Sequence, residues 1–177
     1  MKILLILPPN IGRYVVATVP HAGLAFLAAI LEEKGHIVEV HDMRIHAGNE
    51  QLFNKIGEFK PNMVGISTAS IGYKMAYEIV SAVKQKFPNL PVAMGGSYAS
   101  TVHSRILQDT SADYVVYGEG EHAFLDLAEG MEPKDVNGLI WRDKDEIVMN
   151  PPPKFFHDLD SLPFPNYDKF ELNKMLE

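Results

Sequence analysis

Apolar runs of three to five residues alternate with longer amphipathic stretches through the first 131 residues. Short, almost purely apolar runs are typical of strands buried on both faces of a parallel sheet, and apolar positions at helical spacing indicate helices packed on that sheet. The pattern predicts strands at 3–7, 37–40, 63–66, 92–94 and 114–117. It predicts helices at 23–34, 49–59, 73–87, 102–108 and 122–129.

This alternation favours an α/β fold of three layers, in which helices cover both faces of a five-stranded, doubly wound parallel sheet. The spacing suits the flavodoxin-like (Rossmann-like) strand order 2-1-3-4-5. In that order, ligands bind outside the carboxyl ends of strands one, three and four. We therefore expect functional residues in the loops that follow the predicted strands.

The composition changes after Met131, which predicts one domain at 1–131 and a second segment at 132–177. Apolar stretches at 138–142 and 146–149 flank Asp-Lys-Asp and predict a β-hairpin. Prolines then recur in 151–153 and 163–165, and they favour extended backbone. We expect this tail to be an extended linker that lies over a neighbouring surface.

Charge and cysteine content limit the kinds of partner and cofactor that these residues can bind. Lys and Arg total 16 against 23 Asp and Glu, without a basic cluster, which argues against a nucleic-acid or anionic-membrane partner. No apolar run reaches the ~18 residues that a membrane span needs, and the apolar start is too short for a signal peptide, so we expect a cytoplasmic protein. The chain has no cysteine, so these residues cannot form disulfides or ligate an iron–sulfur cluster.

The loop at 8–22 follows the first predicted strand and is far longer than the usual connection of about 2 to 6 residues. It contains Asn10 and His21 together with several aliphatic and aromatic side chains. An exposed loop gains nothing from so much apolar surface. The loop therefore indicates contact with a flat apolar ligand, and the alternative is a surface excursion without function.

Three further loops combine small, hydroxyl and acidic residues: Ser-Thr-Ala-Ser at 67–70, Gly-Gly-Ser-Tyr at 95–98 and Gly-Glu-Gly-Glu at 118–121. Hydroxyl groups can cap a helix or bind a ligand, and the residues alone leave both open. Paired glycines allow a ligand to touch the backbone, although a simple turn also accepts them. The glutamates can favour a helix N-terminus or border a ligand.

Taken in order, these segments resemble the cobalamin-binding domain of cobalamin-dependent radical S-adenosylmethionine (SAM) enzymes. Residues 20–29, Pro-His-Ala-Gly-Leu-Ala-Phe-Leu-Ala-Ala, are similar to the family's Pro-Pro-Leu-Gly-Leu-x-x-Leu-Ala-Ala segment. Segments 35–42, 61–67, 95–99 and 118–121 recur in that family's order, and 150–165 resembles the connector before its radical SAM barrel. Within the family, the chain is similar to proteins assigned as anaerobic magnesium-protoporphyrin monomethyl ester cyclases of tetrapyrrole biosynthesis.

The resemblance implies cobalamin as cofactor, with its corrin over the strand ends and its nucleotide tail in the sheet crevice. The corrin-binding Asp-x-His-x-x-Gly motif of mutases is absent, and His21 is one position away from the place of its histidine. We expect His21 to hydrogen-bond the backbone near the helix start and not to ligate cobalt, and we expect no catalytic residue. The implied cofactor-binding residues are Asn10, His21, Ser67, Thr68, Ala69, Ser70, Gly95, Gly96, Ser97, Tyr98, Gly118, Glu119 and Gly120.

The resemblance also implies a longer parent enzyme, whose own radical SAM domain holds a [4Fe-4S] cluster and SAM. The parent would perform methyl transfer or oxidative cyclisation, and these residues alone would not turn over. A standalone corrinoid-binding protein, or another flavodoxin-like protein that binds a small ligand, is the alternative. A dinucleotide enzyme would need Gly-x-Gly-x-x-Gly after the first strand, and a receiver domain an Asp after the third; the sequence has neither.

Overall fold

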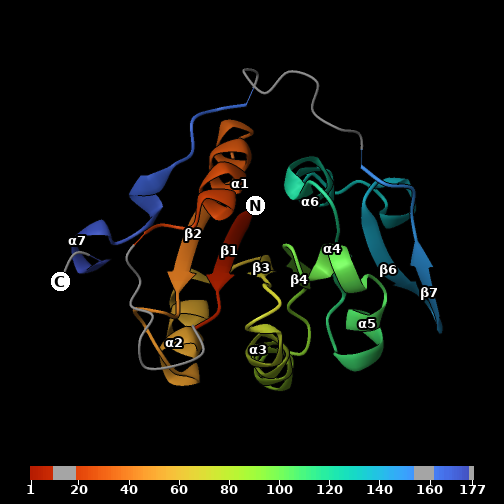
Figure 1. Cartoon of the computed structure of the whole chain (residues 1–177), viewed down its shortest axis with the longest axis horizontal. Helices are drawn as coiled ribbons and strands as arrows, with labels where there is room; N and C mark the ends of the chain where they lie inside the picture. Colours follow the sequence, from red (N-terminus) through yellow and green to blue (C-terminus); the bar gives the residue numbers. More distant parts are fainter. Residues whose placement is uncertain (10–18, 154–161, 176–177) are drawn as a thin grey trace.

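The computed structural model describes residues 1–9, 19–153 and 162–175. These residues form one sheet with the order β2-β1-β3-β4-β5-β6-β7 and helices on both of its faces (Figure 1). The strands are β1 (Lys2–Leu7), β2 (Ile37–Asp42), β3 (Met63–Ser67), β4 (Val92–Gly95), β5 (Tyr114–Val116), β6 (Leu139–Asp143) and β7 (Glu146–Met149). The helices are α1 (Ala22–Glu33), α2 (Asn49–Phe59), α3 (Tyr73–Lys86), α4 (Ala99–Val102), α5 (Arg105–Asp109), α6 (Gly120–Ala128) and α7 (Leu172–Met175), with short 3-10 turns η1 (Pro133–Asp135) and η3 (Tyr167–Lys169).

Strands β1 to β5 are parallel and follow the predicted order 2-1-3-4-5, so the flavodoxin-like α/β class is confirmed. The predicted count of five strands is wrong, because the sheet described here has seven. The predicted hairpin is present, but β6 pairs antiparallel with β5 and so continues the sheet. Leu139 and Ile140 of β6 are fully buried, one in each layer of the core, which explains why the hairpin joins the sheet.

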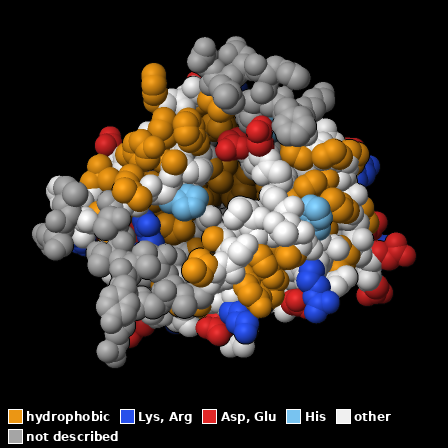
Figure 2. Space-filling view, in the orientation of Figure 1, with side chains coloured by type: hydrophobic (Ala, Val, Ile, Leu, Met, Phe, Trp, Pro, Cys, Tyr) orange, Lys and Arg blue, Asp and Glu red, His pale blue; other side chains and the backbone are white. Residues whose placement is uncertain are grey.

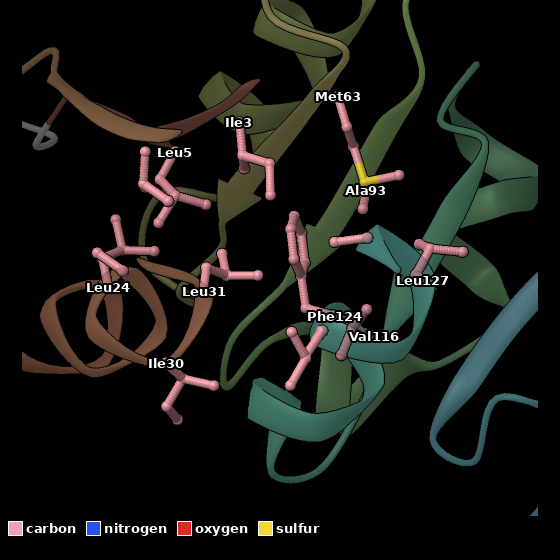
Figure 3. Packing of buried hydrophobic residues seen from close by; sticks show 14 of the residues in the cluster. Ile3, Leu5, Leu24, Ile30, Leu31, Met63, Ala93, Val116, Phe124 and Leu127 are labelled. Atoms are coloured by element: carbon pink, nitrogen blue, oxygen red, sulfur yellow. The ribbon is translucent and has the colours of Figure 1, made fainter. Parts of the chain in front are cut away.

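Two apolar layers enclose the sheet. Helices α1 and α6 cover one face, and α2, α3, α4 and α5 cover the other (Figure 1). Successive side chains of a strand point to opposite faces, so Leu5 of β1 packs in the first layer while Leu4 packs in the second. Figure 3 shows the first layer, where Leu24 of α1 lies beside Leu5 and Phe124 of α6 points toward the sheet. The predicted three-layer architecture is therefore present.

The segment after β4 differs from its prediction. A single helix at 102–108 was expected, but the structure has α4 and α5 on either side of His103. The backbone of His103 has φ = +50° and ψ = −124°, which lies outside the helical region and so ends α4. The residue is not a glycine, so the sequence carries no signal for this break. The other predicted helices agree with the structure to within about two residues at each end, a normal uncertainty for helix boundaries.

Asn150 holds the hairpin to the rest of the sheet. Its side chain is buried, donates to the carbonyls of Pro133 at 2.6 Å and Val136 at 2.7 Å, and accepts from the indole N–H of Trp141 at 3.2 Å. Its backbone carbonyl accepts from the Tyr117 hydroxyl at 2.6 Å. One residue thus satisfies four polar groups where β7 ends, three through its side-chain amide and one through its backbone carbonyl.

Residues 162–175 return to the opposite side of the molecule and pack on α1 (Figure 1). The backbone N–H of Asn166 donates to the carbonyl of Ala25 at 3.0 Å, and its side chain donates to Glu32 at 2.7 Å. Phe170 and Met175 are buried against the α1 layer. This docking agrees with a tail laid over a neighbouring surface, while the division at residue 131 stays a prediction. In the described ranges, no helix is long and apolar enough to cross a membrane.

Candidate functional site

Small residues hollow the sheet on the side covered by α1 and α6. Leu5 of β1, Gly65 of β3 and Ala93 of β4 are cross-strand neighbours in one row. The next pair toward the carboxyl ends on the same face of the sheet is Ser67 and Gly95. Because a glycine and an alanine occupy the middle of this row, a cavity of about 270 Å³ opens between the sheet, α1 and α6. It lies at the strand ends where an open α/β sheet binds its ligands.

The floor of this cavity is apolar. A Cβ atom on Gly65 would lie 2.9 Å from Leu5 Cδ2 and 2.9 Å from two ring carbons of Phe124. These two side chains therefore converge over the bare glycine and close the base of the cavity. Leu24, Leu27, Ala93 and Val116 complete the apolar wall. Figure 2 shows the resulting hollow, with hydrophobic walls, near the centre of one face of the molecule.

His21 stands at the rim as the N-cap of α1. Its Nδ1 accepts a hydrogen bond from the backbone N–H of Leu24 at 3.1 Å, so the predicted contact with the helix start is confirmed. Burial, followed by the positive charge of nearby Arg44, lowers the pKa of His21 below its usual value. The neutral ring that accepts at Nδ1 carries its proton on Nε2, which lies 3.4 Å from Ser67 Oγ. The rim thus places an N–H and a hydroxyl side by side.

Gly96 fixes the loop after β4, which lies beside Ser67 at the rim. Its backbone has φ = +96°, and a Cβ atom there would lie 2.8 Å from the carbonyl oxygen of Thr68. The two loops are tied by their backbones: the N–H of Thr68 donates to the carbonyl of Gly95 at 2.7 Å, and that of Tyr98 donates to the carbonyl of Thr68 at 3.1 Å. Glycine at this position therefore lets the loops after β3 and β4 lie in direct contact.

Seven of the sequence-predicted site residues line the cavity: His21, Ser67, Gly95, Gly96, Gly118, Glu119 and Gly120. The other described candidates do not line it, namely Thr68, Ala69, Ser70, Ser97 and Tyr98. Tyr98 instead stacks on Tyr73 of α3 with ring centroids 4.6 Å apart, on the other side of the sheet. Asn10 lies outside the described residues. For all of these residues, contact with a cofactor stays a prediction.

The residues of the floor and of the helix walls were not predicted from the sequence. They are Leu5, Gly23, Leu24, Leu27, Gly65, Ile66, Ala93, Val116, Glu121 and Phe124. One signal was available, because a glycine inside a buried strand often marks a close approach by a ligand, and Gly65 is such a residue. Glu121 belongs to the acidic loop at 118–121 that the sequence already singled out. The remaining apolar side chains resemble ordinary core residues, and only the fold shows that they border a cavity.

Comparison with known proteins identifies this architecture. An uncharacterized methyltransferase of Pyrococcus horikoshii is 32% identical over 98% of this chain, which covers 40% of that protein. The anaerobic magnesium-protoporphyrin IX monomethyl ester cyclase of Cereibacter sphaeroides is 26% identical over 85% of this chain, which covers 26% of the cyclase. The chain thus spans less than half the length of these relatives.

Solved structures show the same fold. The cobalamin-dependent SAM radical enzyme OxsB, with aqua-cobalamin and SAM bound, superposes with a TM-score of 0.83 at 19% identity, over 99% of this chain and 25% of OxsB. The radical SAM methyltransferase TsrM of Kitasatospora setae, with cobalamin and a [4Fe-4S] cluster bound, gives a TM-score of 0.74 at 22% identity, over 93% of this chain and 31% of TsrM. The sequence model of the B12 binding domain family matches residues 11–128, well over half of the chain. The chain therefore belongs to the B12 binding domain family, and its cofactor is cobalamin.

Proposed function

We propose that the cavity between α1 and α6 receives the nucleotide tail of cobalamin, with the corrin over the carboxyl ends of the strands. The cavity at the strand ends is the observation that carries this proposal, because it opens above the floor that Leu5 and Phe124 form over Gly65. The residues present fit such a group. An apolar floor suits the aromatic base of the tail, and a polar rim suits its sugar and the amide groups of the corrin.

The residues of this chain would bind and orient the cofactor. The floor formed by Leu5 and Phe124 excludes water from the buried end of the tail. At the rim, the Nε2–H of His21 and the hydroxyl of Ser67 can donate hydrogen bonds, while the carboxylate of Glu121 can accept them from amides. When bound, cobalamin supplies a cobalt centre that can accept and donate a methyl group.

We also propose that this domain serves a longer radical SAM enzyme, as the lengths and names of its relatives suggest. The parent's own radical SAM domain would hold the [4Fe-4S] cluster and SAM, and would perform methyl transfer or oxidative cyclisation. Such an enzyme would work in the cytoplasm, where SAM and reductant are available. The relatives are longer enzymes, so they do not favour a standalone binding protein.

Retention of hydroxocobalamin tests the proposed site. We expect the 177-residue chain to carry the chromophore through a desalting column, with a Kd of about 1 μM or below, equivalent to about −8 kcal/mol. Gly95→Val should abolish retention while the protein stays folded. Gly95 lines the cavity, and a Cβ atom there meets nothing closer than the carbonyl oxygen of Val116 at 3.6 Å.

The matched control is Gly57→Val on the exposed side of α2, where a Cβ atom meets nothing within 4 Å. This variant should retain hydroxocobalamin as the wild type does. Circular dichroism would verify that both variants are folded. If the wild type loses the chromophore on the column, the proposed function is wrong. If Gly95→Val retains it fully, the tail does not enter this cavity.

A further inference from the structure

The base of the cavity contains only apolar side chains. Leu5, Ala93, Val116 and Phe124 come from three strands and α6, and each is at most 4% exposed. All four belong to the same core layer, on the α1 and α6 side of the sheet. Figure 3 shows Phe124, Ala93 and Val116 lying close together in this layer. A ligand that reaches the floor therefore contacts only carbon atoms of these four side chains.

The polar groups near the floor are already engaged. The backbone of β3 around Gly65 pairs with β1 on one side and with β4 on the other. The polar side chains that line the cavity are His21, Ser67, Glu119 and Glu121. Ser67 is the last residue of β3, and the other three belong to the loops and the start of α6 at the carboxyl ends of the strands. Among the described residues, therefore, hydrogen-bonding side chains border the mouth of the cavity and none belongs to its floor.

Cobamides differ in the base that ends their nucleotide tail. Cobalamin carries 5,6-dimethylbenzimidazole, whose six-membered ring presents two methyl groups, whereas other cobamides carry adenine, which presents ring nitrogens and an amine at the same edge. A buried polar group without a partner costs the free energy of its lost hydration, and a buried methyl group gains free energy. The same apolar floor thus favours one base and disfavours the other.

We infer that the Leu5, Ala93, Val116 and Phe124 floor makes this domain selective for cobamides with an apolar lower base over those with adenine. The inference rests on the proposed function, in which the nucleotide tail enters this cavity. We expect cobalamin to bind at least tenfold more tightly than the adenine cobamide, a difference of about 1.4 kcal/mol. The lower base must leave cobalt before the tail can enter the cavity. Adenine is the weaker base and leaves cobalt more easily, so this step alone would favour binding of the adenine cobamide.

The test titrates the 177-residue chain with cyanocobalamin, with the cyano form of the adenine cobamide and with cobinamide, which has no base. Isothermal titration calorimetry gives the three Kd values. A Kd for cyanocobalamin at least tenfold below both others supports the inference. Equal affinities for the two cobamides overturn the inference and leave the cobalamin site intact. Failure of all three compounds to bind overturns the proposed function, so the two failures are distinguishable.

A single hydroxyl group on the floor tests the cause. Ala93→Ser places a donor and acceptor in the row beside Gly65, and we expect it to reduce the preference for cyanocobalamin at least threefold. Ala112→Ser is the matched control, since Ala112 is also 1% exposed but does not line the cavity. Thermal melts verify that both variants fold. An unchanged preference in Ala93→Ser, or an equal change in both variants, would overturn the role of the floor, and the comparison of cobamides on the wild type remains an independent test.

Discussion

Gly65→Ala is the most direct perturbation of the cavity. Its Cβ atom would lie 2.9 Å from carbons of Leu5 and Phe124, whereas carbon atoms normally pack at about 3.5 to 4.0 Å. Both side chains must therefore retreat by roughly half an ångström or more. They are at most 4% exposed and enclosed by the core, so the space open to them is the cavity itself.

This overpacking should lower the free energy of unfolding by about 1 to 3 kcal/mol. For a chain of this length, each 1 kcal/mol corresponds to a shift of about 2 to 4 °C in Tm. We therefore expect Gly65→Ala to melt about 2 to 12 °C below the wild type, measured by circular dichroism. The hydroxocobalamin Kd, measured by visible absorbance, should rise at least tenfold, or about 1.4 kcal/mol, because the added methyl and the displaced side chains occupy the floor.

Gly57→Ala separates these effects from a general consequence of replacing glycine. This residue lies inside α2 with nothing within 4 Å of a new Cβ atom, so alanine should stabilise the helix by about 0.8 to 1.0 kcal/mol and leave the Kd unchanged. If Gly65→Ala melts and binds hydroxocobalamin like the wild type, the convergence of side chains over Gly65 does not limit the cavity.

Three other predictions concern the rim and the edge of the sheet. Gly96→Ala should lower the free energy of unfolding by about 1 to 3 kcal/mol in thermal melts, because it strains a positive φ against the Thr68 carbonyl. His21→Ala should lower it by about 0.5 to 2 kcal/mol through loss of the helix cap. The absorption spectrum of bound cobalamin should stay unchanged, because we expect His21 not to ligate cobalt. Burial lowers the pKa of His41 from 6.5 to about 4, so the unfolded chain binds the proton first as pH falls. Stability should therefore decrease between pH 6.5 and about 4, by up to about 3 kcal/mol in urea titrations.

Each of these predictions has a control that isolates its cause. Gly95→Ala should be nearly neutral, since a Cβ atom there has ordinary contacts, and an effect equal to that of Gly96→Ala would contradict the backbone argument. His21→Asn should keep most of the cap, and a spectral shift in any His21 variant would show that this residue ligates cobalt. His41→Gln should flatten the pH dependence of stability, and an unchanged profile would place its cause elsewhere.

Hydrophobic periodicity was sufficient to predict the five parallel strands and most helices, because each buried strand is a short apolar run between turn residues. The partner of the hairpin could not be predicted in the same way. The stretch at 138–149 shows that two strands meet, but the pairing of Trp141 with Tyr114 and of Ile140 with Val115 depends on the position of β5 in space. The sequence therefore predicted the hairpin and missed its membership of the sheet.

The loop sequences were sufficient to predict residues at the rim of the cavity but not those of its floor. Gly95, Gly96 and Gly118 stand out by composition and line the cavity. Tyr98 follows the same glycines, yet the turn at Gly96 leads into α4 and its ring stacks on α3, away from the cavity. Sequence position beside a motif therefore predicts the loop in which a residue lies. The direction of its side chain depends on the backbone conformation, which the motif does not show.

The pairing of β6 with β5 also has a consequence for how much of the chain can exist as a separate folding unit. A chain that ended near residue 131 would leave β5 as an edge strand with unpaired backbone groups, and with Val115 and Val116 buried on its two faces in the intact protein. Exposed apolar edges template association with other chains. The edge strand of the intact sheet is the short β7, which carries Glu146 and follows Asp143, Lys144 and Asp145. A short edge strand with charged residues is much less prone to associate with other chains. We therefore expect the hairpin to be the part that keeps this domain monodisperse when it is excised or transplanted.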